Sequence, residues 1–449
     1  SYPGNQKTIV KLSNYLYDAS GHYKRILSYF ADLSTFAWDI NVSVKNEREI
    51  DFALLKKKYE DLGFALDKMN LPHELGKIMH TLLREGVYYG YAYEDGKDFF
   101  FAKLDINACR SRNIEDGVHN VEVNLGHINE SNLGTFPPEI RQVWRDYIEN
   151  NGNLPHNLNA NGGIWYELDS KKSVCIRMDE TVCTAVPLFI YLFPDIMAVD
   201  DIKELAKKRA EMENYRIIAM KIPLKKDANE VNDFAVGNDI VLENISTAAA
   251  VTDQNIALFP TALVPEAINF DQKTNDFNNV KNSIDELNSN AGINGNIFNG
   301  GNSASLMISV ENDSSIIYRI HRQMERWINR RIKLFSYNSK NFRFKLHFLP
   351  ITVYNREKVV DRCLKMCQAG LPYKTKLGAA LGMSPCELQG ADYLENSVLN
   401  LGSRWRVLGS SFTQKSGEGG RPPVNDEDLS ERGAQTREGG YNDADLRNY

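Results

Sequence analysis

The sequence of 449 residues lacks the common motifs of metal sites and of nucleophilic catalysis. Its six cysteines include no CxxC pair, and no histidine pair at zinc-ligand spacing accompanies them. His73, Glu74 and His80 have the spacing HE-x5-H, whereas metalloproteases use HExxH. No serine lies in GxSxG, and no carboxylate pair has an identifiable acid–base environment. We therefore expect no catalytic residue, no metal and no cofactor, and we do not expect an enzyme.

Long hydrophobic runs and an excess of positive charge are also absent. The longest apolar run, "AVPLFIYLF" at 185–193, is too short to span a bilayer, so we expect no membrane partner. No signal-peptide pattern is seen at the start of the sequence. The formal net charge is −6, so any contact with nucleic acid must use local groups or a cavity that tolerates it. The cysteine usage is typical of a reducing, cytoplasmic folding environment, and Cys363 and Cys367, which share a helix face, are most simply small buried hydrophobic residues.

Hydrophobic spacing divides most of the chain into helices and strands. Ser20 is a plausible N-cap for the first predicted helix, Pro72 begins another in its first turn, and Asp95-Gly96 joins two aromatic strands as a hairpin. The stretch 217–270 has few helical cues and favours β-structure. The predicted helices are 20–33, 52–69, 72–85, 137–152, 200–217, 272–289, 305–336, 356–369 and 374–400, and the further predicted strands are 120–125, 164–168, 173–178 and 342–353.

The helix predicted at 305–336 carries an apolar stripe and, parallel to it, a basic one. The apolar stripe runs from Ile317 to Phe335 and includes Trp327. A basic stripe is most often a solvated face, and the alternatives are a subunit interface or a nucleic-acid contact. We expect its arginines to pair with carboxylates of their own or a neighbouring subunit, because arginine suits bidentate interface pairs. They are Arg319, Arg322, Arg326 and Arg330.

Directly before that helix lies "NGNIFNGGN", a loose and uncharged segment at 294–302. Gly295 and Gly300 have the separation of a phosphate-binding loop, but Gly301 and Asn302 stand where that loop needs lysine and Ser/Thr. Without the lysine nothing neutralises the terminal phosphates, so the P-loop interpretation fails. From local composition alone, a plain flexible linker is the simplest interpretation.

Ten phrases of the sequence, taken in order, resemble one family. Their order matches that of portal proteins, the head–tail connectors of tailed double-stranded DNA bacteriophages, in the branch of long-tailed phages of Gram-positive hosts. The resemblance spans roughly residues 8–414. The phrases are "SGHYKRILSYFADLSTFAWDI", "LREGVYYGYAYEDG", "FFFAKLDINACR", "IEDGVHNVEVNL", "FPPEIRQVW", "FPDIMAVDDIKELAKKRAEMENYRIIAMKIPL", "QMERWINRRIKLF", "FKLHFLPITVYNREKVV", "AGLPYKTKLGAALGMSP" and "LENSVLNLGSRWRVLGSSFTQ".

The resemblance implies an α+β portal fold that assembles as a ring, typically of about twelve subunits, around a central channel. The C-terminal segment has the composition of a disordered tail and matches no family motif that we can place. The implied divisions are 1–198 N-terminal wing, 199–216 stem helix, 217–270 clip, 271–290 returning stem helix, 291–303 tunnel loop, 304–355 long helix and wing strand, 356–412 crown-like helical region and 413–449 tail.

The same resemblance implies that the loop faces the channel. Asparagine and glycine offer hydrogen bonds and mobility without the cationic grip that would oppose sliding of a duplex. Phe298 either contacts the DNA or anchors the loop against its own helix. The implied channel residues are Asn294, Gly295, Asn296, Ile297, Phe298, Asn299, Gly300, Gly301 and Asn302.

The implied function is a conduit for packaging and ejecting viral DNA, without catalysis of its own. The implied partners are further copies of the chain, the viral double-stranded DNA, the major capsid protein and scaffold, the large terminase motor and the head–tail adaptor of the neck. The implied location is the portal vertex of the virion, after assembly in the host cytoplasm. A motor or nuclease is disfavoured, because the Walker lysine and any DxD-type or HNH-like cluster are missing. A non-catalytic adaptor ring of the neck, or a module whose loop binds a protein, remains as an alternative.

Overall fold

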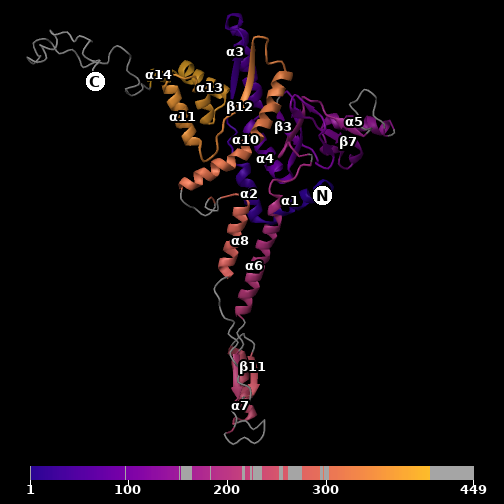
Figure 1. Ribbon diagram of the computed structural model, residues 1–449, viewed down its shortest axis with the longest axis vertical. Helices are drawn as coiled ribbons and strands as arrows, with labels where there is room; N and C mark the ends of the chain where they lie inside the picture. The colour runs from indigo at the N-terminus through magenta and orange to yellow at the C-terminus, as the bar shows by residue number, and fades with distance from the viewer. Residues whose placement is uncertain are drawn as a thin grey trace, which may run out of the picture. The chain divides into compact units, whose positions relative to one another are not determined.

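The computed structural model describes residues 2–96, 98–150, 152, 164–182, 184–214, 218–222, 225, 235–251, 256–260, 276–293, 297 and 303–404. The chain contains both helices and strands and divides into two compact units, Ser1–Leu388 and Gln389–Tyr449. Figure 1 shows the order of the elements along the chain.

The first four α-helices of the first unit are α1 (Tyr2–Ala19), α2 (Gly21–Ala31), α3 (Phe52–Lys68) and α4 (Leu71–Glu85), with a strand between α2 and α3. The predicted N-cap is confirmed, because Ser20 Oγ accepts a hydrogen bond from the amide of Tyr23. Pro72 lies in the first turn of α4 as expected, and Gly86 ends that helix in the left-handed region at φ +81°. The buried faces of these helices, including Tyr23, Leu62 and Met79, form one side of the main core.

A three-stranded antiparallel sheet separates the main core from a second one. Its strands are β2 (Val87–Glu94), β3 (Phe99–Lys103) and β9 (Ser173–Arg177), in the order β3-β2-β9, and the predicted hairpin around Asp95-Gly96 is confirmed. Alternation along β2 divides its side chains, so that Tyr88 and Ala92 enter the main core and Val87 and Tyr91 enter the second.

The second core lies under a smaller sheet and one helix. The sheet has the order β4-β7-β8, with β4 (Cys109–Arg110), β7 (Glu122–Asn124) and β8 (Trp165–Glu167), and the helix is α5 (Pro138–Glu149). Trp144 of α5 is buried there and donates from Nε1 to the carbonyl of Ile128 over 3.1 Å. A short hairpin, β5 (Ile114–Glu115) and β6 (Val118–His119), adjoins this region and turns through Asp116 and Gly117, both at positive φ.

The main core is closed by the long helix α10 (Ser303–Leu334) and by a two-stranded sheet. That sheet pairs β1 (Trp38–Val44) with β12 (Phe342–Phe348) in antiparallel register, Trp38 opposite Phe348 and Val44 opposite Phe342. β12 alternates as its pattern predicts, with its phenylalanines and Leu346 buried and the residues between them exposed. Figure 1 shows β12 beside α10.

The segment 193–290 forms two helices and the module between them. α6 (Phe193–Asn214) and α8 (Asp276–Asn290) run side by side, and the described strands β10 (Ile218–Ile222) and β11 (Ile256–Pro260) pair in parallel (Figure 1). The prediction of β-structure with few helical cues at 217–270 is wrong in part, because α7 (Asn238–Val251) occupies its middle. β-branched residues such as Ile240 and Val241 favoured strand by propensity, but the alanines at 248–250 are good helix formers.

Three helices follow β12. They are α11 (Arg356–Gln368), α12 (Lys374–Ala380) and α13 (Pro385–Asp392), and Leu349, Ile351, Ala379 and Ala380 form a third, small core. The single helix predicted at 374–400 is therefore wrong. The chain breaks it at Gly382, where φ is +91°, and α13 is followed directly by a π-helical turn from Tyr393. In the second unit, Tyr393–Val398 forms a π-helical turn and α14 covers Leu401–Arg404.

Candidate assembly surface and channel segment

The apolar stripe of α10 holds the helix against the main core. Ile317, Ile320, Met324, Trp327, Ile328 and Ile332 are all buried as predicted. Phe335 is an exception, because it is 44% exposed and lies under the guanidinium of Arg331 at 4.5 Å. The predicted stripe therefore ends one turn earlier than the sequence pattern indicates.

Three hydrogen bonds, made by two side chains of α10, fix the position of this helix along β9. Gln323 accepts from the amide of Arg177 over 3.1 Å and donates to the carbonyl of the same residue over 2.7 Å. Trp327 donates from Nε1 to the carbonyl of Ser173 over 2.7 Å. These bonds satisfy strand groups that would otherwise be buried without partners, so a shift of α10 by one turn would cost all three.

The C-terminal half of the basic stripe is engaged within the chain. Arg330 is 4% exposed and donates to Glu115 over 2.7 Å and to Asn120 over 2.9 Å. Arg326 donates to Glu180 over 2.5 Å. Both arginines therefore pair with polar groups of their own subunit, and Arg330 fastens the β5–β6 hairpin to α10.

The N-terminal half of the stripe is different. Arg319 and Arg322 are exposed, and among the described residues no hydrogen bond or ion pair engages either side chain. Arg319 nevertheless contributes to lowering the pKa of Asp179, after two hydrogen bonds from Thr181. A role in a subunit interface stays a prediction for the stripe, and these two arginines have the freest side chains for it.

Arg331, which the sequence analysis did not single out, is more buried than Arg319 and Arg322. Arg331 lies among the rings of Phe99, Trp327 and Phe335 and donates to Glu94. Burial is the main cause that lowers its pKa, partly offset by Glu94. In the sequence, the one sign that Arg331 has a separate role is that it follows Arg330 directly and so lies off the basic stripe.

The predicted channel residues 294–302 lie outside the described residues, apart from Ile297. Ile297 is half-buried and packs against the main core. It lines a cavity of about 340 Å³ together with Tyr29 of α2, with Leu33 just after that helix, and with Val353 and Tyr354. Asp313 of α10 accepts a hydrogen bond from Tyr29 Oη over 2.9 Å beside this region.

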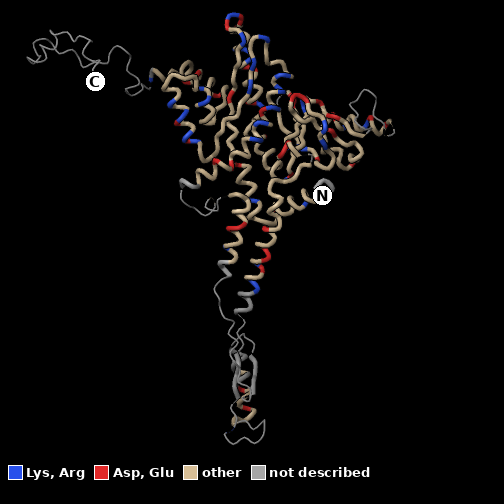
Figure 2. Tube along the Cα trace, in the orientation of Figure 1, with Lys and Arg blue, Asp and Glu red and all other residues tan. Residues whose placement is uncertain are grey.

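The two predicted stem helices are antiparallel neighbours. Asn290, at the end of α8, donates to Asp195, at the start of α6, over 2.9 Å. Phe193, Ile196 and Val199 of α6 and Leu287 of α8 are buried in the main core. Further along α6 the burial stops, and Leu205 is 65% exposed. Figure 2 shows acidic and then basic positions along α6, where Asp200, Asp201 and Glu204, with Lys203 among them, are followed by Lys207 and Lys208.

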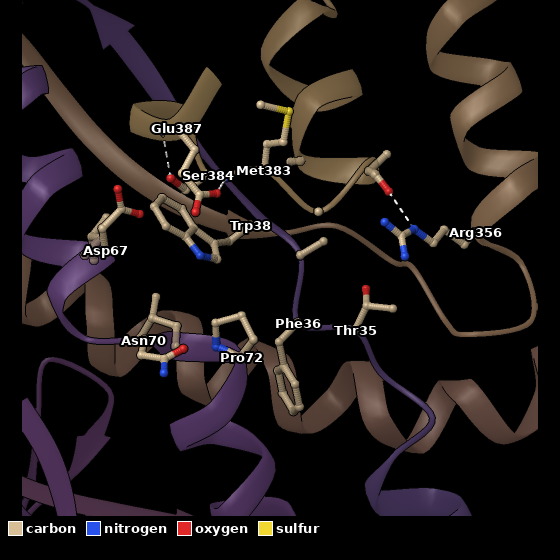
Figure 3. A pocket seen from close by; sticks show the side chains of 16 residues that line it. Thr35, Phe36, Trp38, Asp67, Asn70, Pro72, Arg356, Met383, Ser384 and Glu387 are labelled. Carbon is tan, nitrogen blue, oxygen red and sulfur yellow. Dashed lines mark hydrogen bonds between the residues drawn. The ribbon is translucent and has the colours of Figure 1, made fainter. Parts of the chain in front are cut away.

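A cavity of about 450 Å³ separates the end of α3 and the start of α4 from α12 and α13 (Figure 3). Its charged groups already have partners. Arg356 donates to the carbonyls of Ala380 and Leu381 over 3.1 and 2.6 Å, and Glu387 accepts from the amide of Ser384 over 2.8 Å. Burial raises the pKa of Asp67, although hydrogen bonds from Ser384 and Cys386 oppose the shift.

The remaining motifs have structural partners. Glu74 is buried and accepts from the amide of Phe101 over 2.8 Å, and His80 lies 2.9 Å from Asp32. Within the described part of the chain, no group of three or more His, Cys, Asp or Glu could hold a metal ion. Cys363 is buried, and desolvation is the main cause that raises its pKa. No helix among the described residues is long and apolar enough to cross a membrane.

The chain was also compared with known proteins. No protein-family model matches it, and no curated protein sequence does. Among solved structures, it is similar to a chain from the virion of a native gene transfer agent particle, with a TM-score of 0.44 and 10% identity. It is also similar to a chain from the neck of an empty gene transfer agent particle, with a TM-score of 0.42 and 10% identity. Each likeness covers 85% of this chain and 94% of the other. Likenesses at TM-scores below 0.5 do not establish a shared function.

Proposed function

We propose that this protein is a portal-type subunit: copies of it form a ring around a channel for viral DNA at one vertex of a capsid. One observation carries the proposal. The chain leaves a mixed helix–strand unit along α6, passes through the 218–260 module, returns along α8 and enters the long helix α10. That is the wing, stem, clip, stem and long-helix order that the sequence resemblance implies, and the 294–302 segment falls between stem and long helix.

The burial of the stem helices supports assembly into a ring. Beyond their buried base, α6 carries exposed Leu205 together with charged residues, and α8 has only a thin apolar stripe with Ile284 half-buried. A helix pair of this kind buries too little apolar surface to be stable alone. Neighbouring copies in a ring would cover the exposed sides through a heterologous interface.

The proposed partners follow from this arrangement. The clip, including α7 and the β10–β11 pair, would present the docking surface for the terminase motor and the neck adaptor, and the rest of the ring would contact the capsid protein and scaffold. The sequence of α6 has six acidic and four basic residues, and this small negative excess suits a channel that does not grip DNA phosphates. The protein would act without catalysis, in the virion, after assembly in the host cytoplasm.

Lysines at the 294–302 segment test whether it faces DNA. In the double variant Asn296→Lys with Asn299→Lys, each subunit gains two positive charges. Duplex binding should become stronger and more salt-dependent, because each added phosphate contact releases counterions. Packaging should slow while assembly of the ring is unchanged. The measurements are duplex affinity across a salt series and a packaging assay.

Glu130→Lys is the matched control. It changes the charge by the same amount at an exposed position in the loop after His127. It should leave packaging and the salt dependence near the wild-type values. If the double variant behaved like this control in a normal ring, the segment would not face DNA, and a neck adaptor ring would become the better assignment.

A further inference from the structure

The two edges of the β1–β12 sheet differ in how many of their outward main-chain groups are hydrogen-bonded by side chains. On β12, side chains cover the outer edge. The amide of Phe344 donates to Asn338, that of Leu346 to Asn329 and that of Phe348 to Glu325, over 2.8, 2.8 and 2.7 Å. Asn329 also donates to the carbonyl of Leu346 over 3.1 Å. In the part of the chain that the structure describes, no side chain bonds in this way to the second half of β1.

The register identifies which β1 groups point outward. In an antiparallel ladder, residues directly opposite each other either both bond across the pair or both point away from it. The amide of Phe344 bonds to Asn338 and the carbonyl of Phe342 accepts from Ser339, so the main-chain groups of both residues point away from β1. The amides and carbonyls of the residues opposite them, Val42 and Val44, therefore point away from β12. The amide of Ile40 is taken by Asp39. Among the described residues, no hydrogen bond engages the main-chain groups of Val42 or Val44.

Side chains on the apolar face of this edge are exposed. Val42 and Val44 share a face with the buried phenylalanines of β12, yet they are 40% and 43% exposed. Exposed main-chain donors and acceptors beside valine side chains are the features to which another strand adds.

The opposite face carries free positive charge. Arg343 lies opposite Ser43, and Lys345 lies opposite Asn41, so each long cation faces a small polar residue on the edge strand. Both cations are exposed, and among the described residues no ion pair engages them. Asn41, Ser43 and Lys345 also line a hollow of about 540 Å³ beside α10. The carboxylates that line it, Glu325 and Asp116, are already paired with His347 and Lys333.

We propose that the β1 edge over Asn41–Val44 binds an extended segment of another protein, in which apolar residues alternate with acidic ones. The main chain of that segment would pair with Val42 and Val44. Its apolar side chains would cover the two valines, and its carboxylates would reach Arg343 and Lys345 across the short side chains of β1. The site does not depend on the function proposed above, since it requires only the folded chain.

A proline at position 42 gives the sharpest test. The amide of Val42 points outward, so Val42→Pro removes a donor from the open edge and leaves the bonds to β12 in place. Val42→Thr keeps the main chain and is the control. The probe is a short fluorescent peptide of alternating valine and glutamate, with a valine–lysine peptide of equal length for comparison, and the measurement is fluorescence anisotropy.

The acidic peptide should bind the full-length protein, and the basic one should bind at least about tenfold more weakly. Val42→Pro should weaken binding of the acidic peptide by about tenfold or more, whereas Val42→Thr should stay within about twofold. Arg343→Glu with Lys345→Glu should reverse the preference between the two peptides. If the proline variant does not fold, an acidic peptide methylated on alternate amides should lose its binding to the wild type.

Three results would overturn the proposal. They are no binding of the acidic peptide, equal binding to the wild type and to folded Val42→Pro, and no preference between the two peptides. A change of self-association in Val42→Pro, without peptide binding to the wild type, would assign the edge to a second copy of the chain. Because these readouts use neither DNA nor the ring, their failure would leave the proposed portal function standing.

Discussion

His321 lies on the inner side of α10 against a group of aromatic rings. Phe36, Tyr318 and Phe348 contact its ring, and Nε2 lies 2.8 Å from Ser34 Oγ. Burial lowers the pKa of this histidine to about 4, with Glu325 opposing the shift and His347 adding to it. The imidazole is therefore neutral in the folded protein at pH 7 and links the residues before β1 to the long helix.

Acid should destabilise the fold through this residue. A histidine whose pKa is lower in the folded state stabilises that state fully above its unfolded pKa of about 6.5, and the contribution is lost as the pH falls toward about 4. At pH 5 the loss is about 2 kcal/mol. We expect His321→Gln to show a smaller drop in its urea midpoint between pH 7 and pH 5 than the wild type. An equal drop in both proteins would show that other groups cause the acid sensitivity.

For the arginines of the basic stripe, the sequence predicted the helix face but not the partners of the side chains. Their spacing on one helix face was visible in the sequence, and the burial of the adjacent apolar stripe followed from the same periodicity. The partners were not visible, because Arg330 and Glu115 are separated by 215 positions in the chain. Periodicity predicts which face a residue occupies, but only the tertiary fold shows which distant carboxylate meets it.

At the scale of elements, the docking of α13 on α3 depends on a missing side chain. A Cβ on Gly63 would collide with Cys386 Sγ, whereas a Cβ on Gly76 of α4 would meet nothing within 4 Å. Both glycines lie inside helices, where glycine is less stable than alanine. Only at Gly63 does the absence of a side chain allow close packing that offsets this loss.

The two glycines form a matched pair for mutation. Gly76→Ala should raise the free energy of unfolding by up to about 1 kcal/mol, because alanine is the better helix former. Gly63→Ala should lower it by about 1–3 kcal/mol, because overpacking exceeds that gain. Denaturant midpoints measure both. In a Cys386→Ala background, Gly63→Ala should become neutral or stabilising, and continued destabilisation there would mean that Cys386 is not what the alanine meets.

Elements with clear end signals were predicted well from the sequence. Ser20, Pro72 and the Asp95-Gly96 turn give α2, α4 and the β2–β3 hairpin within a few residues. α7 was missed because its β-branched residues resemble a strand. α1 was also missed, since its first turn contains Pro3 and Gly4, although Val10 and Leu16 are buried. Proline costs little in a first turn, where the amides lack helical partners in any case.

Division into wing, stem, clip and loop came from the resemblance, not from periodicity, and the 294–302 segment that would contact DNA lies outside the described residues. The structure supplies the antiparallel stem pair, the exposed outer part of α6 around Leu205, and Arg319 and Arg322, whose side chains make no hydrogen bond or ion pair among the described residues. In the proposed ring, neighbouring copies would cover these groups, so the proposal requires that the protein form a closed ring.

The mass of the assembly in solution tests that claim most directly. Size-exclusion chromatography with light scattering, at micromolar concentration and modest salt, should give one species of about twelve times the chain mass of 51.0 kDa, with ring-shaped particles in micrographs of the same fraction. A single species at 51.0 kDa across a range of concentrations and salt would contradict the account.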